Sequence, residues 1–135
     1  MIVNVEVEYC GNDDFRLADG RSADTLNPKE LLLYATACCA GKTVAGIMSK
    51  QRIEPRKFTI KLYGDMDTAE VTAQSTYTAF RIVYNVECAS EVDKVKAYET
   101  VKLADEKYCG MLKMIRRIAP VRTEIDINMT ASATI

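Results

Sequence analysis

The chain has 135 residues, of which 48% are hydrophobic and 27% charged, and its formal net charge is −1. This length and composition predict one domain, residues 1–135, with a sizeable hydrophobic core. The near-zero net charge argues against a nucleic-acid-binding protein and against attraction to an anionic membrane surface. We therefore expect neither nucleic acid nor membrane among the partners.

The first half of the chain predicts two strands followed by a long helix. Residues 2–9 alternate polar and apolar side chains with period two, and residues 15–18 can return as a second strand. Asn27, Pro28 and Glu30 resemble a capping box that opens a helix of about 22 residues. This helix is apolar on almost all sides and rich in small residues. We expect it to lie in the core, against a sheet or a partner, rather than in a membrane.

The second half predicts three strands, two helices and a closing strand. In chain order these are strands at 58–63, 70–78 and 80–88, a helix that begins after Ser90, a short helix that ends near Pro120, and a strand at 121–127. The polar face of the first of these helices, which includes Asp105, is expected to be solvated. The order is ββ-α-βββ-αα-β, and its runs of antiparallel strands predict an α+β fold.

The cysteine content favours thiol chemistry in a reducing compartment. Five cysteines without a secretion signal indicate free thiols in the cytoplasm rather than a disulfide scaffold. The chain has no histidine and no Cys-x-x-Cys pair, so it points away from most hydrolases and predicts neither a metal site nor a cofactor. The five are Cys10, Cys38, Cys39, Cys88 and Cys109.

Two of these cysteines have settings that suit reactivity. Cys39 lies in the long helix, and Cys109 lies at the break between two helical runs, where backbone amides of the following turn can face its sulfur. A nucleophilic cysteine needs a lowered pKa, and without histidine the activating charge must come from arginine, lysine or a helix N-terminus. The alternative is that each thiol only packs, as buried cysteines often do. Packing is also the expected role of Cys10, Cys38 and Cys88.

Charged candidates for such a site are few. Glu30 could orient an arginine or a substrate, or it could serve only as the helix cap. Arg16 and Arg21 are near enough in sequence to lower the pKa of a thiol, or they could be solvated loop residues. The residues alone leave these alternatives open.

Two segments together resemble the OsmC/Ohr superfamily of osmotically inducible protein C and organic hydroperoxide resistance proteins, in its OsmC-like branch. Residues 27–33, Asn-Pro-Lys-Glu-Leu-Leu-Leu, followed by Cys39 and Gly41, resemble its Pro-x-Glu-Leu-Leu…Cys helix. Residues 108–110, Tyr-Cys-Gly, resemble its second cysteine motif, which is usually Cys-Pro. The resemblance covers nearly the whole chain.

The resemblance implies an OsmC-like fold, with curved antiparallel sheets around a long central helix, in an intertwined homodimer whose sites contain residues of both chains. It also implies a peroxiredoxin-type thiol peroxidase of the stress response. Cys39 would match the peroxidatic thiolate, which is oxidised to sulfenic acid, and Cys109 the resolving thiol. The substrate would be an organic hydroperoxide, and the reductant a lipoyl or thioredoxin-like dithiol.

The chain departs from the hydroperoxide-resistance branch at several positions. Lys29 stands where that branch has its catalytic glutamate, and Glu30 lies about 180° away round the helix from Cys39. The loop at 11–14 lacks the catalytic arginine, although Arg16 is nearby. An alternative interpretation is therefore a non-catalytic homodimer that binds a small hydrophobic ligand. A purely structural dimer is a third possibility.

Overall fold

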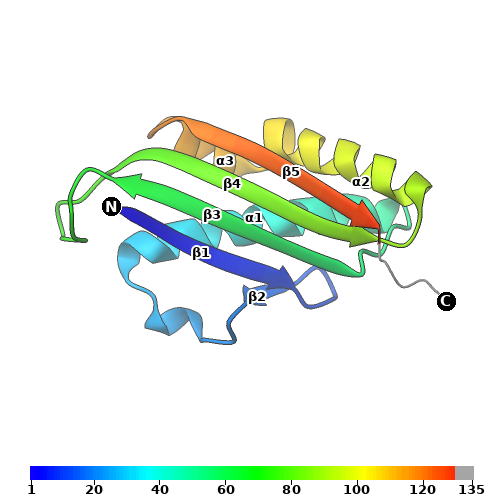
Figure 1. Ribbon diagram of the computed structural model, residues 1–135, viewed down its shortest axis with the longest axis horizontal. Coiled ribbons are helices and arrows are strands. Elements are labelled where there is room, and N and C mark those ends of the chain that lie inside the picture. The colour runs from blue at the N-terminus through cyan, green and yellow to red at the C-terminus, as the bar shows by residue number, and fades with distance from the viewer. Residues whose placement is uncertain (130–135) are drawn as a thin grey trace.

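Five strands form one sheet, and the helices lie together behind one of its faces (Figure 1). The computed structural model describes residues 1–129. The strands are β1 (Ile2–Tyr9), β2 (Phe15–Leu17), β3 (Lys57–Met66), β4 (Tyr77–Cys88) and β5 (Val121–Met129). The helices are η1 (Ala23–Thr25), α1 (Pro28–Lys50), α2 (Glu91–Leu103), the π-helical turn η2 (Ala104–Tyr108) and α3 (Gly110–Arg116). Across the sheet the strand order is β2-β1-β3-β4-β5.

One face of the sheet carries the hydrophobic core. In β1 the buried side chains are Val3, Val5 and Val7, each at most 8% exposed, while the alternate residues point to solvent. β4 repeats the pattern, with Ile82 and Tyr84 fully buried. The period-two alternation that predicts these strands therefore also decides which face meets the helices.

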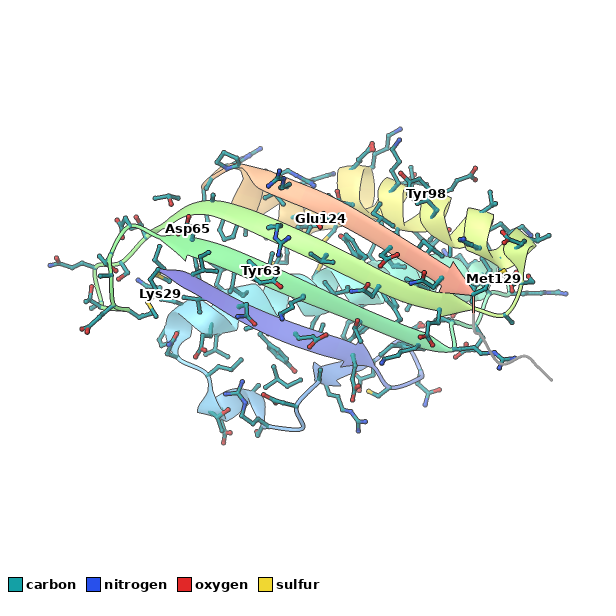
Figure 2. The ribbon with its side chains drawn as sticks, viewed as in Figure 1. Lys29, Tyr63, Asp65, Tyr98, Glu124 and Met129 are labelled. Atoms are coloured by element: carbon teal, nitrogen blue, oxygen red, sulfur yellow. The ribbon has the colours of Figure 1, made fainter. Side chains whose placement is uncertain are left out.

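The other face of the sheet is polar and, within residues 1–129, is not covered by a helix (Figure 2). Tyr63 and Glu124 lie on it, and Arg81 connects them. The Arg81 guanidinium donates to the Glu124 carboxylate at 2.8 Å and lies over the Tyr63 ring at 4.3 Å from its centroid. The sheet is thus apolar toward the helices and polar on its outer face.

Helix α1 begins with the predicted capping box. The Asn27 side chain accepts a hydrogen bond from the Glu30 backbone N–H, the Glu30 carboxylate accepts one from the Asn27 backbone N–H, and both distances are 2.9 Å. Pro28 opens the first turn, where its missing N–H costs nothing. The start, the type and the length of this helix are confirmed.

The length and mean hydropathy (1.5) of α1 would also allow it to cross a membrane, and within residues 1–129 it is the one helix with these properties. A core helix of a globular protein shares them. In this fold Leu33, Ala37 and Val44 of α1 are fully buried. The packing agrees with the predicted core helix.

The chain forms one strand fewer than its alternation pattern predicts. Instead of three strands at 58–63, 70–78 and 80–88, the structure has two, β3 and β4, joined by a loop at 67–76. The predicted order ββ-α-βββ-αα-β is therefore wrong in its middle section. The strand predicted at 58–63 is also longer than expected, because β3 continues through Gly64 to its end at residue 66.

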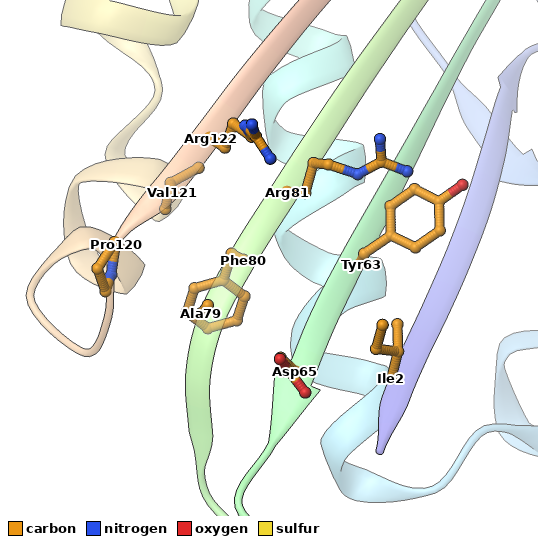
Figure 3. A pocket seen from close by; sticks show the side chains of 9 residues that line it. All are labelled: Ile2, Tyr63, Asp65, Ala79, Phe80, Arg81, Pro120, Val121 and Arg122. Carbon is orange, nitrogen blue, oxygen red and sulfur yellow. The ribbon is translucent and has the colours of Figure 1, made fainter.

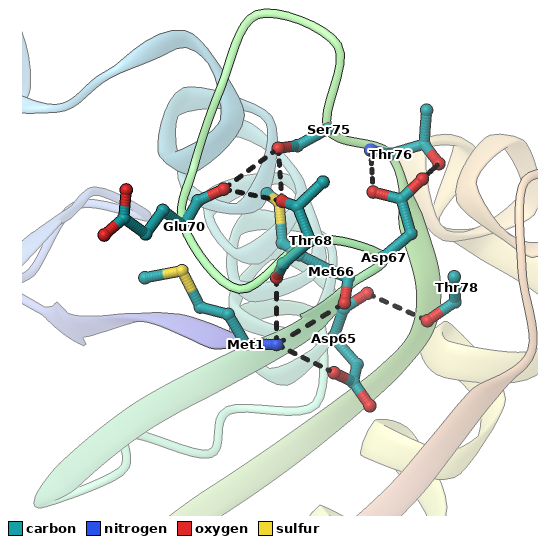
Figure 4. Close-up of polar contacts among 9 residues, drawn as sticks. All are labelled: Met1, Asp65, Met66, Asp67, Thr68, Glu70, Ser75, Thr76 and Thr78. Carbon is teal, nitrogen blue, oxygen red and sulfur yellow. Dashed lines mark hydrogen bonds and ion pairs between the residues drawn. The ribbon is translucent and has the colours of Figure 1, made fainter.

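The loop at 67–76 is held by polar side chains instead of a strand ladder (Figure 4). The Ser75 hydroxyl, in a residue 1% exposed, lies 2.6 Å from the Thr68 hydroxyl. Asp67 accepts from the backbone N–H and the hydroxyl of Thr76 at 2.9 and 2.8 Å, and these hydrogen bonds lower the pKa of Asp67. Short polar side chains that bond within a loop compete with sheet pairing, and a period-two pattern does not reveal this competition.

The sheet is single and mixed, whereas the family resemblance implies antiparallel sheets. β1 to β4 pair in antiparallel fashion, but β4 and β5 pair in parallel. The cause is their connection, because α2, η2 and α3 cross over the helical face before β5 begins, and a crossover returns the chain in the same direction. The α+β class and the OsmC-like fold with its long helix are confirmed, and the homodimer stays a prediction.

The close approach of α1 to the sheet gives a stability prediction at Gly41. A Cβ atom there would lie 2.5 Å from the tip of the Phe15 ring, which is packed against the rings of Tyr9 and Phe58 at 5.4 and 5.3 Å between centroids. Gly41→Ala should lower the free energy of unfolding in urea by about 1–3 kcal/mol through overpacking. Gly46→Ala is the matched control on the same helix: its Cβ would meet nothing within 4 Å, and it should stabilise by about 0.5–1 kcal/mol. Responses of the same sign would contradict this account.

A second prediction concerns Gly64 in β3. A Cβ atom there would lie 2.2 Å from the Tyr77 ring, whose hydroxyl donates to the Lys29 carbonyl at 2.6 Å. Because the ring cannot swing away without losing that bond, Gly64→Ala should lower the free energy of unfolding by about 1–3 kcal/mol. In a Tyr77→Phe background the ring is free to move, so the same substitution should cost less. Strictly additive effects in urea unfolding would argue against this explanation.

Candidate functional site

The structure brings together the two cysteines that the sequence selects. Cys39 comes from the middle of α1, and Cys109 lies 70 positions later, between η2 and α3. The Cys109 thiol donates to the Cys39 sulfur, and the two Sγ atoms are 3.5 Å apart. A disulfide needs a sulfur–sulfur distance of roughly 2.05 Å, so a shift of about 1.5 Å would join them.

Cys109 is the buried member of this pair. Its residue is 1% exposed, and its backbone N–H donates to the Ala104 carbonyl at 2.9 Å across the π-helical turn. Burial raises the pKa of the Cys109 thiol to about 12, more than the opposing backbone N–H groups of Leu112 and Met111 lower it. The neighbouring Cys39 raises it further. At neutral pH Cys109 is therefore a thiol, which suits its role as the hydrogen-bond donor.

Cys39 is only half-buried and faces the Cys109 thiol. Its neighbour Cys38 lies about 100° away round the helix. Burial raises the pKa of Cys38, against the smaller effects of the Tyr34 hydroxyl and the Lys42 ammonium. The pair that the structure assembles is thus Cys39 with Cys109.

The remaining cysteines lie apart from this pair. Cys88 is buried at the end of β4, as expected for a packing residue. Cys10 is exposed, with its thiol 3.4 Å from the Asp14 carbonyl, so the expectation that it packs is wrong. Within residues 1–129 no group of three or more Cys, Asp or Glu residues is arranged to hold a metal ion.

The charged candidates Glu30 and Arg16 have other partners. The Glu30 carboxylate completes the helix cap with Asn27, about 13 Å along the helix from Cys39. Arg16 lies on the outer face of β2 and pairs with Glu8 at 3.0 Å, whereas α1 lies behind the inner face. The structure therefore does not bring either side chain to Cys39 within one chain. Their catalytic roles stay predictions.

Two other cations near the start of the chain are also engaged elsewhere. The Lys29 ammonium donates to the backbone carbonyls of Ser75 and Ala73, which ties the start of α1 to the loop at 67–76. Arg21 pairs with Asp19 at 2.6 Å on the surface. The pKa of the Asp19 carboxyl is lowered, first by the hydrogen bond from the Arg21 backbone N–H and then by the one from its side chain. Lys29 thus has a structural role at the position where the hydroperoxide-resistance branch has a glutamate.

A buried carboxylate, Asp105, lies four positions before Cys109 in the chain and is not predicted by the sequence pattern. Asp105, in the π-helical turn, is 4% exposed rather than solvated, because three side chains bond to it. Its carboxylate accepts from the Tyr84 hydroxyl at 2.8 Å, the Arg116 guanidinium at 2.9 Å and the Thr123 hydroxyl at 3.0 Å. The available signal is that Tyr84 and Thr123 fall on inward-facing strand positions, where a polar group needs a partner.

A shallow hollow of about 580 Å³ lies on the outer face of the sheet (Figure 3). Apolar residues such as Ile2, Ala79 and Val121 line it together with Arg81 and Arg122. Neither cysteine of the pair lines this hollow, because the thiols lie on the helical side. The hollow and the thiol pair are therefore separate features.

Comparisons with known proteins agree with this architecture. The family described as OsmC-like protein matches residues 20–124, whereas no curated protein matches the chain in sequence. A hypothetical protein from Aquifex aeolicus has 24% identity over 96% of both chains, with a TM-score of 0.64. An OsmC-like protein from Mycoplasma pneumoniae has 13% identity over 91% of this chain and 95% of that one, with a TM-score of 0.59. The organic hydroperoxide resistance protein OhrB of Bacillus subtilis has 21% identity over 92% of this chain and 98% of that one, with a TM-score of 0.55.

At these identities the solved structures establish the fold, and the family match extends over most of the sequence. The long capped helix, the cysteine in its middle and the second cysteine after the π-helical turn all lie within the matched residues. The chain belongs to the OsmC-like protein family and has the fold of OsmC and the organic hydroperoxide resistance proteins.

Proposed function

We propose that this protein is a thiol-dependent reductase of organic hydroperoxides, with Cys39 as peroxidatic and Cys109 as resolving cysteine. The observation that carries this proposal is the 3.5 Å contact between a half-buried and a fully buried sulfur. A peroxidatic sulfur must be accessible to substrate from solvent, and a resolving sulfur must lie close enough to the peroxidatic sulfur to form a disulfide. The half-buried Cys39 and the buried Cys109 are compatible with these two requirements, which supports the proposal.

In the first step the Cys39 thiolate attacks the terminal oxygen of the hydroperoxide. The sulfur–oxygen bond forms as the oxygen–oxygen bond breaks, and the alkoxide takes up a proton and leaves as the alcohol. Cys39 is then a sulfenic acid, two electrons more oxidised than the thiol.

In the second step the Cys109 sulfur attacks the Cys39 sulfur. The disulfide forms, the sulfur–oxygen bond of the sulfenic acid breaks, and the hydroxyl leaves as water with the proton of the Cys109 thiol. A dithiol donor, lipoyl or thioredoxin-like, then reduces the disulfide by two thiol exchanges. Over one cycle a hydroperoxide and a dithiol become an alcohol, water and a disulfide.

We further propose that the working unit is a cytoplasmic homodimer. Several apolar side chains of α2, α3 and the following turn are more than a third exposed, which is typical of a protein interface. They are Val92, Val95, Tyr98, Leu103, Met114 and Ile118. A second chain would also offer a source for the activating positive charge that Arg16 does not supply to Cys39 within one chain.

A different observation favours the alternative function, binding of a small hydrophobic ligand without catalysis. A groove of about 400 Å³ runs between α2 and β5, with Val95, Tyr98 and Ile125 in its lining. These apolar side chains would suit such a ligand, and four charged residues also line the groove: Glu91, Lys94, Glu99 and Asp126. The experiment below separates the two functions.

The deciding experiment adds one equivalent of cumene hydroperoxide to the reduced protein and maps the peptides by mass spectrometry. We expect rapid formation of a Cys39–Cys109 disulfide, faster than with hydrogen peroxide. In Cys109→Ser the resolving thiol is missing, so Cys39 should accumulate as sulfenic and then sulfinic acid. Cys38→Ser is the matched control and should still form the disulfide. If both thiols of the wild-type protein stay reduced, the peroxidase proposal fails, and binding of a hydrophobic ligand becomes the better supported function.

The buried state of Cys109 predicts a pH dependence for disulfide closure. The attacking form is the thiolate, and the pKa of Cys109 is raised to about 12, so its thiolate fraction grows about tenfold per pH unit through the neutral range. In stopped-flow measurements, the rate of closure after rapid sulfenic acid formation should rise with this slope from pH 6 to pH 9. A plateau near pH 8 would show that Cys109 titrates as an ordinary thiol, and would contradict this environment.

A further inference from the structure

The turn that precedes Cys109 is π-helical, and this sets the direction of its side chain. Residues Ala104–Tyr108 form a wider turn than the α-helix before them, and the Cys109 N–H reaches back five residues to the Ala104 carbonyl at 2.9 Å. Such a turn holds one residue more than an α-helical turn. Each residue turns the helix by about 100°, so the following side chains point about 100° away from their direction in a continuous α-helix.

π-helical turns are rare because α-helical hydrogen bonding is the more favourable alternative. A π-helical turn therefore has to be stabilised by contacts that an α-helical turn in the same place could not make. Asp105, the second residue of the turn, supplies them to three other elements. Its carboxylate accepts from Tyr84 of β4, from Thr123 of β5 and from Arg116 of α3.

The contact with Arg116 closes the turn from its other end. The guanidinium donates to the Asp105 carboxylate at 2.9 Å and to the Asp105 backbone carbonyl at 2.7 Å. Since Arg116 is the last residue of α3, this double contact spans Cys109, which lies between the two. Within residues 1–129 no buried side-chain nitrogen or oxygen lacks a hydrogen-bond partner, so the Asp105 network is fully satisfied.

We propose that Asp105 is a positioning residue for disulfide closure: it locks the π-helical turn and so holds the Cys109 sulfur against Cys39. Without its carboxylate the turn relaxes toward an α-helix, and the Cys109 side chain rotates away from α1. This inference rests on the proposed function, which requires the two sulfurs to join. It adds a residue that touches neither sulfur nor substrate and that acts through the backbone.

The test measures how readily the two sulfurs join, without any peroxide. The reduced protein is equilibrated with glutathione, so that protein dithiol and oxidised glutathione give the protein disulfide and two reduced glutathiones. The equilibrium constant is the effective concentration of Cys109 at Cys39. Asp105→Asn keeps the shape of the side chain but removes its charge, and should lower this value at least about tenfold. Tyr84→Phe removes one hydrogen bond from a neutral donor, and should lower it about two- to fivefold.

Two controls distinguish positioning from general loss of stability. Glu124→Gln breaks the ion pair with Arg81 on the outer face and should leave the effective concentration unchanged. Gly64→Ala is destabilised through Tyr77 in the sheet and should also leave it unchanged as long as the protein is folded. A parallel drop in all four variants would overturn the positioning role.

The outcomes separate this inference from the proposed function. If wild-type protein forms the disulfide with glutathione but not with cumene hydroperoxide, the peroxidase proposal fails and Asp105 can still be tested. If folded Asp105→Asn keeps the wild-type value, the positioning role is wrong whatever peroxide does. Should Asp105→Asn fail to fold, Tyr84→Phe and Thr123→Val decide, and unchanged values in both would overturn the inference.

A kinetic readout complements the equilibrium. In Asp105→Asn, Cys39 should be oxidised by cumene hydroperoxide as fast as in the wild type, while closure slows at least about tenfold. Dimedone should then capture the accumulated sulfenic acid on Cys39. An equal slowing of oxidation and closure would indicate general damage to the site, and would contradict a role confined to positioning Cys109.

Discussion

The close packing of α1 on the sheet is the constraint on which the rest of the structure depends. Small residues on its buried face let the helix approach, and at Gly41 even a methyl group would meet the Phe15 ring. After β4 the chain forms α2, η2 and α3 over the same face of the sheet. Because α1 lies close to the sheet there, the residue at the end of η2 comes into contact with α1. The position of Cys39 in the middle of this helix is therefore what allows a cysteine 70 residues later to touch it.

The environments of the two sulfurs differ in a way that suits two successive steps. Cys109 is buried, its pKa is raised, and its backbone is fixed by a hydrogen bond across the π-helical turn. Cys39 is half-buried on a regular helix whose backbone is set by α-helical bonding. The irregular backbone therefore lies next to Cys109, the proposed resolving cysteine, whereas Cys39, the proposed peroxidatic cysteine, lies on a regular helix.

Elements that depend on interactions between residues close in sequence can be predicted from the sequence, and elements that depend on distant partners cannot. The start of α1 could be predicted because Asn27 and Glu30 cap it within four residues, and β1 because its alternation is local. The loop at 67–76 and the parallel β5 could not, since they depend on side-chain bonding within the loop and on where a crossover lands. Asp105 was missed for the same reason: its partners come from β4, β5 and α3, and on its own helix it looks like one more solvated charge.

Three cations of this chain have structural partners away from Cys39. Arg116 forms an ion pair with Asp105, and Arg16 forms one with Glu8. The Lys29 ammonium donates a hydrogen bond to a backbone carbonyl of the loop at 67–76. Each of these cations is therefore committed to a structural partner, and none of these contacts involves Cys39. A peroxidase needs positive charge or hydrogen-bond donors at its attacking sulfur, because the thiolate is the reactive form. In the proposed homodimer the second chain would be one source of this charge.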